Sequence, residues 1–369
     1  MAFYIGLMLG TSVDAVDVAL VDITERGIHL QAAESYSLPH NLHQHLLHCS
    51  QHSQDNTPLA DIAALDHRLA EIFAANILDL LATQQLDATD IVAIGNVGQT
   101  LYHAPQQTPA YTWQLGNSAI IAGRTGINTI GDFRRCDMAA GGQGAPLTPT
   151  FHHAVFHSTT ENRAIVNIGG IANVTVLDKN LADYPQVGFD TGTGNCLIDA
   201  WCHQHTGEFY DKDAQWAKTG VVQPELLERL CADAYFQQLP PKSTGRDYFN
   251  LSWLQHCVAL PHYKPEDIQI TLCQFTAQTI ANAVQNYDID SLFVCGGGVH
   301  NPLIMKGLAD ILPDMTIQST QALNINPDWV EAISFAWFAH QRVHQLSCDL
   351  HTTTGARTPT VLGSTYIAQ

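Results

Sequence analysis

Positive charge is scarce in this sequence. The 369 residues include 16 lysines and arginines against 35 aspartates and glutamates, which leaves a formal net charge of −19. A field of that sign repels nucleic acids and anionic membranes, so neither is an expected partner. It also repels nucleotides, so any phosphate site has to rely on local N–H groups, a few basic residues and Mg²⁺.

Long apolar runs are also absent. No window reaches the roughly 18 apolar residues that a membrane span needs. The N-terminus lacks the basic segment followed by an apolar core that is typical of a signal peptide. The nine cysteines are scattered, without a Cys-x-x-Cys pair, and indicate free thiols in a reducing compartment. We therefore expect a cytoplasmic protein.

Several common motifs are missing. The chain has no Gly-x-x-x-x-Gly-Lys-Ser/Thr, no Gly-x-Gly-x-x-Gly before a helix, no Gly-x-Ser-x-Gly and no His-Glu-x-x-His. Nineteen histidines raise the question of a metal, but none has a cysteine or carboxylate partner at ligand spacing. We expect solvated histidines and assign no residue as a metal ligand; the clustered ones are His40, His43, His45, His48, His52, His152, His153, His203 and His205.

What is present is the composition of a large globular protein. Hydrophobic residues make up 46% and charged residues 14%, and the length suits two domains. Apolar periodicity predicts helices and short buried strands in alternation, which is typical of an α/β sheet with crossovers. The predicted helices are 59–81, 117–125, 197–203, 301–312 and 329–343, and the predicted strands are 91–95, 128–130, 164–168, 173–177 and 291–295. Residues 131–146 read as one long loop, and the tail from Ser347 as loosely structured.

Two segments share one pattern. Residues 4–22 read as a β-hairpin, with Val16, Val18 and Leu20 on one face of its second strand. Residues 164–177 repeat the strand, glycine turn and strand. A repeated unit predicts two similar domains, at 1–150 and 151–369, with the last helix able to pack back on the first. Chance similarity between two hairpins is the alternative.

The tip of the first hairpin carries ligand-binding groups. Gly10 lets a ligand approach the backbone, and Thr11 and Ser12 offer donors to phosphate oxygens. Asp14 can hold a metal ion, directly or through water. A plain structural turn, the alternative, needs none of these hydroxyls.

A second glycine-rich loop, residues 188–195, precedes the helix predicted from 197. Its backbone N–H groups can cradle a phosphate at a helix start. Asp190 lies beside the apolar Phe189 and is a candidate general base. An aspartate that caps its own loop in an Asx turn is the alternative.

Two basic loops and a triple glycine complete the candidates. Arg134 and Arg135 can bind a carboxylate bidentately, or they form an ordinary surface pair. Residues 241–246 form a similar basic loop. The run 295–298, Cys-Gly-Gly-Gly, removes side chains, so a flat ring can lie against the backbone. A strand-to-helix turn is the other interpretation of that run.

Together these segments resemble one family, the anhydro-N-acetylmuramic acid kinases of bacterial cell-wall recycling. The match runs in order along essentially the whole chain. The matching segments are 6–8, 10–12 with Asp14, 98–100, 132–135, 141–146, 167–173, 189–192, 242–246, 295–298 and Glu331.

The resemblance implies a fold and a reaction. The fold is the two-domain α/β architecture of the actin and sugar-kinase superfamily, with ribonuclease-H-like domains and a cleft between them. ATP with Mg²⁺ phosphorylates O6 of 1,6-anhydro-N-acetylmuramic acid while water opens the anhydro bridge at C1, giving N-acetylmuramic acid 6-phosphate. The partners are then the amino sugar and ATP, and a homodimer is expected.

The resemblance also implies roles for residues at matching positions. Asp190 is the base that activates water. The residues that contact the sugar are Gln99, Arg134 and Glu331, and Arg134 binds the lactyl carboxylate of the sugar. The predicted ATP contacts are Gly10, Thr11, Ser12, Val13, Asp14, Ala15, Val16, Asp17, Gly169, Gly170, Gly192, Gly194, Asn195, Gly296 and Gly297.

The chain departs from the family pattern at several positions. Leu9 and Ala15 replace a serine and a glycine of the first loop, and Val97 replaces a histidine. Thr193 stands where proline is usual, and Val299-His300 follows the triple glycine. Leu9 loses a hydroxyl near phosphate, and Ala15 makes a positive φ costly, each at about 1–3 kcal/mol.

These departures keep two alternatives open. One is a non-catalytic relative that binds sugar or nucleotide, and the other is an ordinary sugar kinase in which Asp190 deprotonates a hydroxyl and no hydrolysis occurs. The presence of Asp190 and of the remaining loops favours the coupled reaction.

Overall fold

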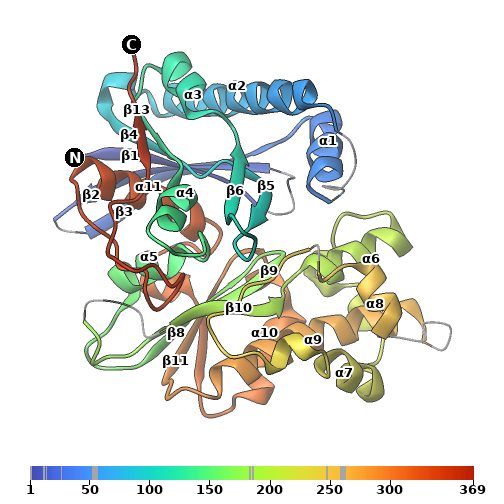
Figure 1. Cartoon of the computed structure of the whole chain (residues 1–369). Helices are drawn as coiled ribbons and strands as arrows, with labels where there is room; N and C mark the ends of the chain where they lie inside the picture. The colour runs from blue at the N-terminus through green and yellow to red at the C-terminus, as the bar shows by residue number, and fades with distance from the viewer. Residues whose placement is uncertain are drawn as a thin grey trace. The chain divides into compact units, whose positions relative to one another are not determined.

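The structure is a computed structural model that describes residues 2–10, 13, 15–25, 27–51, 57–182, 184, 187–246, 248–257 and 263–369. It divides into two compact units: unit 1 is Met1–Phe151 with Trp329–Gln369, and unit 2 is His152–Asp328 (Figure 1). The range expected for the C-terminal domain is thus split, because residues 329–369, with the last helix, belong to unit 1.

Unit 1 is built on a six-stranded mixed sheet of order β13-β7-β4-β1-β2-β3. Its strands are β1 (Phe3–Leu9), β2 (Ala15–Thr24), β3 (Gly27–Ser37), β4 (Ile91–Asn96), β7 (Thr129–Gly131) and β13 (Ser364–Tyr366). A separate hairpin joins β5 (Gln99–Ala104) to β6 (Tyr111–Leu115). The helices are α1 (His40–Gln51), α2 (Leu59–Gln84), α3 (Ser118–Thr125), α4 (Phe133–Ala139), α5 (Thr148–Phe156), which runs on into unit 2, α11 (Val330–Val343) and the 3₁₀ turn η1 (Ala88–Asp90).

Unit 2 is built on a five-stranded mixed sheet of order β10-β9-β8-β11-β12. Its strands are β8 (Arg163–Ile168), β9 (Ile171–Leu177), β10 (Val187–Thr193), β11 (Ser291–Cys295) and β12 (Thr316–Ser319). Its helices are α6 (Cys196–Thr206), α7 (Pro224–Cys231), α8 (Leu251–Cys257), α9 (Pro265–Val284) and α10 (Pro302–Ile311), with 3₁₀ turns η2 (Lys212–Ala214), η3 (Ala217–Thr219), η4 (Ala234–Gln237), η6 (Gly297–His300) and η7 (Thr320–Leu323).

The two sheets share one topology. In each sheet the first three strands in sequence pair antiparallel, and two further strands then add in parallel beside the first strand. The strand order is β3-β2-β1-β4-β7 in unit 1 and β10-β9-β8-β11-β12 in unit 2. The repeat predicted from the two hairpins is confirmed, and so is the α/β class.

Helix α11 lies directly on the unit 1 sheet. A Cβ added to Gly6 of β1 would lie 1.8 Å from the Ala332 carbonyl oxygen, and one added to Gly95 of β4 would lie 2.0 Å from that of Phe335. Glycine at both positions lets the helix backbone touch the strands. The helix covers what would be an open face of β2, so Ala19 and Val21 are as buried as Val18 and Leu20.

Most predicted elements are confirmed, and three expectations are wrong. The loop 131–146 contains α4. The tail from Ser347 is ordered, since Cys348 pairs with Thr360, β13 pairs with β7, and Leu350 and Leu362 are buried. His152 and His153 are buried rather than solvated, and their rings pair with the Thr175 hydroxyl and the Leu181 carbonyl.

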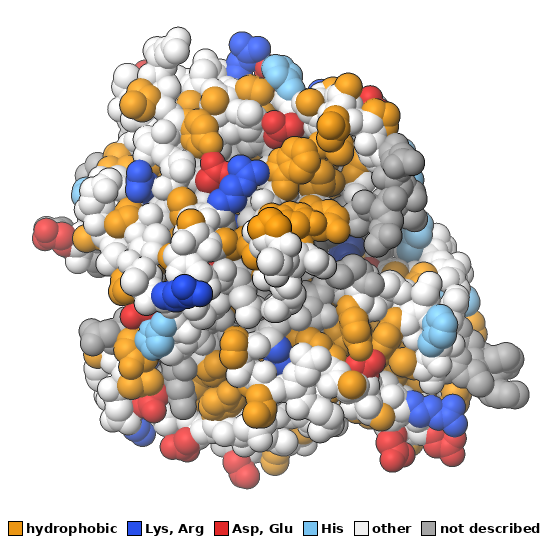
Figure 2. Space-filling model, viewed as in Figure 1, with side chains coloured by type: hydrophobic (Ala, Val, Ile, Leu, Met, Phe, Trp, Pro, Cys, Tyr) orange, Lys and Arg blue, Asp and Glu red, His pale blue; other side chains and the backbone are white. Residues whose placement is uncertain are grey.

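The remaining expectations concern free thiols, membrane spans and the distribution of positive charge. None of the nine cysteines, all of them among the described residues, forms a disulfide. Within the part of the chain that the structure describes, no helix is long and apolar enough to cross a membrane. On the face in Figure 2, lysines and arginines are scattered rather than gathered in one patch.

Candidate functional site

Asp190 lies in the middle of β10, half-buried, with its backbone fixed on both sides. Its N–H donates to the Lys242 carbonyl at 3.1 Å, and its carbonyl accepts from the Tyr235 hydroxyl at 2.7 Å. The carboxylate Oδ2 accepts the Thr244 N–H at 3.0 Å. Because that donor lies 54 residues away, the contact is not an Asx turn of Asp190's own loop.

A lysine lies in the same neighbourhood. Lys242 Nζ donates to the Tyr235 carbonyl at 3.3 Å and lies 4.6 Å from the centroid of the Tyr235 ring. Burial lowers the pKa of Lys242, and the negative charge of Asp190 opposes that shift. Burial, with the Asp190 charge, raises the pKa of Tyr235, so its hydroxyl stays protonated. Asp190 is therefore a carboxylate held by a backbone donor and a nearby cation.

The predicted nucleotide loops of unit 2 meet beside the first turn of α6. The N–H groups of Gly194 and Asn195 donate to the carbonyls of Gly170 and Gly169 at 2.9 and 2.8 Å. A Cβ on Gly194 would lie 2.2 Å from the Gly169 oxygen, so the approach requires glycine. These two amides, expected to face phosphate, are engaged within the protein.

One polar group in this loop does lack a partner. The Thr193 hydroxyl is buried and makes no hydrogen bond with the residues described by the structure. Gly192, one residue earlier, has a φ of 140°, and a Cβ there would lie 2.7 Å from the Phe236 ring. The Thr193 hydroxyl is therefore one polar group of this loop that suits a ligand's acceptor.

The triple glycine lies against the same region. Gly296 has a φ of 76°, and a Cβ there would lie 2.3 Å from Asn167 Oδ1. At Gly297 a Cβ would meet only Asn195 Nδ2, at 3.9 Å, so open space lies above this backbone. The structure thus brings Gly169, Gly194, Asn195 and Gly297 together on unit 2.

In unit 1 the first predicted phosphate loop is described in part. Thr11, Ser12 and Asp14 lie outside the described residues. The Val13 N–H donates to the Gly10 carbonyl at 3.0 Å, which closes a turn between β1 and β2. Val16 and Asp17 continue along β2.

The backbone strain of this loop is not where the sequence suggested. Ala15 pairs with Ser37 as the first residue of β2, and its φ is not positive. Val13 instead has a φ of 59° and is buried. A β-branched residue in that region is strained, and its burial in the unit 1 core offsets the cost.

The three predicted sugar contacts belong to unit 1. Gln99 is 7% exposed, and its Oε1 is buried with no hydrogen-bond partner among the described residues. Arg134 Nη1 donates to the Gly144 carbonyl at 3.0 Å. Glu331 is half-buried in the first turn of α11. An unpartnered acceptor at Gln99 suits a ligand hydroxyl.

The glycine-rich segment 141–146 is held by a carboxylate that sequence reasoning did not single out. Asp137 is fully buried and accepts the Gly144 N–H at 2.6 Å and the Thr354 hydroxyl at 2.7 Å. Burial raises the pKa of Asp137, and these two donors and Arg134 oppose the rise. No sequence signal marked Asp137, because residues 131–146 were expected to form a loop and the helix α4 that positions it was not predicted.

The adjacent arginines point in different directions. Arg135 Nε donates to the Thr112 carbonyl at 3.3 Å, and its Nη1 pairs with Asp132 at 2.9 Å. Tyr366 donates to the other Asp132 oxygen at 2.6 Å. Arg135 is therefore used inside unit 1, and a shared bidentate site for both arginines does not form.

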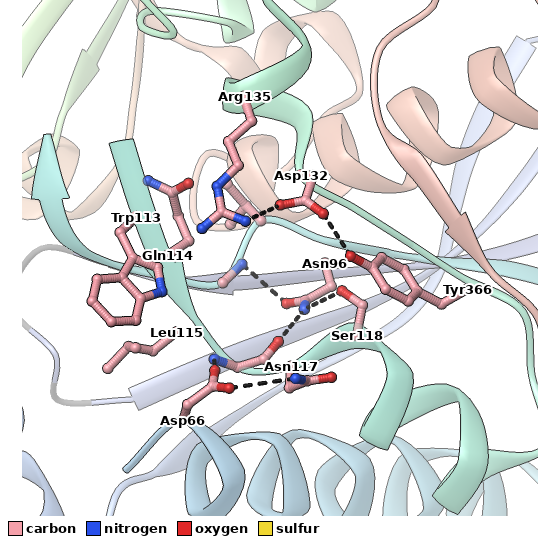
Figure 3. Close-up of a pocket in the computed structure, with 13 residues that line it drawn as sticks. Asp66, Asn96, Trp113, Gln114, Leu115, Asn117, Ser118, Asp132, Arg135 and Tyr366 are labelled. Atoms are coloured by element: carbon pink, nitrogen blue, oxygen red, sulfur yellow. Dashed lines mark hydrogen bonds and ion pairs between the residues drawn. The ribbon is translucent and has the colours of Figure 1, made fainter. Parts of the chain in front are cut away.

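Arg135 lines a polar cavity of about 140 Å³ in unit 1 (Figure 3). Asn96, the last residue of β4, donates to the Gly116 carbonyl at 2.6 Å and to Ser118 Oγ at 3.0 Å. Asp66 accepts the Gly116 N–H at 2.8 Å. The charged groups of this cavity already have partners within the protein, and the Asn96 hydrogen bonds link the β4–β5 and β6–α3 turns.

A family model described as anhydro-N-acetylmuramic acid kinase matches residues 2–368. Anhydro-N-acetylmuramic acid kinases of Photobacterium profundum and Vibrio vulnificus are 46% and 45% identical, over 99% and 98% of this chain and 98% of each relative.

A solved structure, (R)-2-hydroxyglutaryl-CoA dehydratase component A of Acidaminococcus fermentans, aligns with 93% of this chain and 100% of its own. Its identity is 10% and its TM-score 0.47, so the fold is described from sheet topology alone.

Proposed function

Because this chain belongs to the anhydro-N-acetylmuramic acid kinase family, an ATP-using kinase family, we propose that it couples phosphoryl transfer to hydrolysis. ATP phosphorylates O6 of 1,6-anhydro-N-acetylmuramic acid while water attacks C1 and opens the bridge. The product is N-acetylmuramic acid 6-phosphate, and the reaction serves peptidoglycan recycling.

Asp190 is the proposed base. The observation that carries this role is its carboxylate, held at Oδ2 by the Thr244 N–H beside the Lys242 ammonium. Both interactions favour the ionised form, which is the form that accepts a proton.

One base suffices for the chemistry. O6 leaves C1 and attacks phosphorus, so phosphoryl transfer replaces protonation of the leaving oxygen. Water arrives opposite the bridge, which predicts inversion at C1. Much of the rate then comes from placing sugar, water and ATP in line.

The ATP contacts follow from the loops described above. In unit 2 these are Gly169, Gly170, Gly192, Gly194, Asn195, Gly296 and Gly297, with adenosine above the open backbone at Gly297. In unit 1 they are residues 10–17, of which Thr11, Ser12 and Asp14 lie outside the described residues.

We propose that Mg²⁺ enters with ATP. The described residues contain no cluster of three metal-binding side chains, and Mg²⁺ bound to nucleotide phosphates needs one or two carboxylates. The carboxylates among residues 10–17 are Asp14 and Asp17. When bound, the ion neutralises charge on the phosphates.

The sugar contacts are Gln99, Arg134 and Glu331. Arg134 offers a cation to the lactyl carboxylate, and Gln99 offers its unpartnered Oε1 to a hydroxyl. A homodimer and a cytoplasmic location remain proposals that rest on the family resemblance and on cysteine usage.

The test is the mass of the product formed from 1,6-anhydro-N-acetylmuramic acid and ATP·Mg²⁺. The expected product is heavier than the substrate by one phosphate and one water. A product heavier by phosphate alone would establish an ordinary sugar kinase and remove the hydrolytic step. Asp190→Asn should abolish turnover while ATP still binds; full turnover in that variant would contradict the role of Asp190.

A further inference from the structure

Asn173 faces Asp190 across two paired strands. The register of β9 and β10 places Asn173 directly opposite Asp190, and the bulge between Asp190 and Gly192 begins immediately after this pair. Residues directly opposite on antiparallel strands project to the same face, with Cβ atoms about 4.5–5.5 Å apart. The two side chains therefore share one face of the unit 2 sheet.

The pair extends a polar row across the sheet. Asn173 is also opposite Asn167 of β8, and Asn167 is opposite Cys295 of β11. Asn167 Oδ1 accepts from the Cys295 thiol at 3.9 Å, and Asp190 Oδ2 accepts from the Thr244 N–H. The outer members of the row thus have partners within the protein.

Asn173 differs from its neighbours. Its Oδ1 is buried and accepts no hydrogen bond from any residue that the structure describes. A buried acceptor left unpaired loses the hydrogen bonds that water would give it, which destabilises the folded state. Such a group, next to the carboxylate proposed as the base, indicates that its donor is a ligand of the site.

We propose that Asn173 holds the water that attacks C1, an inference that rests on the proposed function. Water has two O–H groups, and the base accepts only one of them. The second O–H donates to Asn173 Oδ1, so two acceptors fix the molecule and aim an oxygen lone pair at C1.

The step balances with Asn173 unchanged. The water oxygen forms a bond to C1, and its proton passes to the Asp190 carboxylate. The C1–O6 bond breaks, its electron pair on O6 forms the new bond to phosphorus, and the bond from phosphorus to the leaving ADP oxygen breaks.

An amide is the acceptor that suits this place. A second carboxylate beside Asp190 would disfavour ionisation of both, as like charges do. A neutral amide oxygen accepts the hydrogen bond and leaves Asp190 ionised. This distinguishes Asn173 from a spectator residue of the sheet.

Asn173→Ala tests the proposal. We expect kcat to fall about 10- to 100-fold, with KM for ATP and for the sugar within about twofold, because the lost hydrogen bond acts on the reacting water. Asn180→Ala, an exposed asparagine after β9, is the matched control and should keep wild-type kinetics. Circular dichroism and ATP binding establish that each variant is folded.

Asn173→Asp separates water binding from a structural role. It restores an acceptor and adds a charge, so activity should return at high pH, with the acid limb of the pH–rate profile about one unit higher. If Asn173→Ala does not fold, Asn173→Asp and Asn173→Ser are measured in its place.

Two outcomes overturn the inference: wild-type kcat in Asn173→Ala, or an unshifted acid limb in Asn173→Asp. Failure of the proposed function looks different. In that case Asp190→Asn keeps its turnover, or the product contains no added water, whatever Asn173 does.

Discussion

His152 shows at the residue scale how the fold fixes the charge of a single group. The side chain is fully buried, and its Nδ1 lies 2.8 Å from the Thr175 hydroxyl. Burial lowers the pKa of His152 to about 3. In the unfolded chain a histidine takes up a proton near pH 6.5, so between the two values only the unfolded state binds it.

Stability should therefore fall as pH drops from about 6.5 towards 3, by up to about 1.4 kcal/mol per pH unit from this residue. Urea unfolding at about pH 7.5 and pH 5 measures it, and His152→Gln should remove that component. The exposed His67→Gln variant is the control. Equal pH dependence in wild type and His152→Gln would contradict the prediction.

The sequence provides candidate site residues where a motif contains them, as at Asp190 and in the glycine loops, and their roles stay predictions. The sequence does not show which partner each atom has. Val13 rather than Ala15 takes the positive φ, and the amides of Gly194 and Asn195 turn to the β8–β9 hairpin. These outcomes depend on contacts with residues far away in the sequence, and local sequence patterns do not predict such contacts.

At the scale of elements, the contact of α11 with the unit 1 sheet requires glycine. Gly6→Ala should destabilise the protein by about 3 kcal/mol or more, because its Cβ would overlap the Ala332 carbonyl. Gly123→Ala, at an exposed position of α3 where a Cβ would have nothing within 4 Å, should stabilise it by about 0.5–1 kcal/mol. Thermal unfolding of both variants measures whether stability falls or rises. A loss of stability in Gly123→Ala, or no loss in Gly6→Ala, would refute the packing argument.

The ordered tail gives a second prediction at this scale. Thr354→Val removes a donor from the buried Asp137 carboxylate, which should cost about 1–3 kcal/mol. The exposed Thr358→Val is the matched control. Chemical denaturation compares the two, and equal stabilities would mean that the Asp137 contact does not hold the tail.

Element prediction succeeded where periodicity was strong, as in α2 and α11, and failed where order comes from distant contacts. The tail has no repeating apolar pattern, yet Gln143 donates to the Thr354 carbonyl and Arg357 to that of Ala140. Helix α4 has seven residues, too few for a periodic signal.

At the scale of the whole molecule, the net charge of −19 lowers the stability of the folded protein. Self-repulsion destabilises a compact chain, and salt screens it. Raising KCl from about 10 to 150 mM shortens the Debye length from about 30 to 8 Å, so Tm should rise by a few degrees. The rise should vanish near the sequence pI of about 5.2, where the net charge is small. A Tm that ignores salt at pH 8 would show that the repulsion is negligible.

The discontinuity of unit 1 has a consequence during synthesis on the ribosome. Unit 2 is contiguous, but unit 1 takes α11 and β13 from the last 41 residues, 329–369. At about 5–20 residues per second, unit 2 can finish folding seconds before those residues emerge. Until then the face of the nascent sheet around Gly6 and Gly95, which α11 covers in the folded protein, stays exposed. A chaperone would recognise this apolar surface.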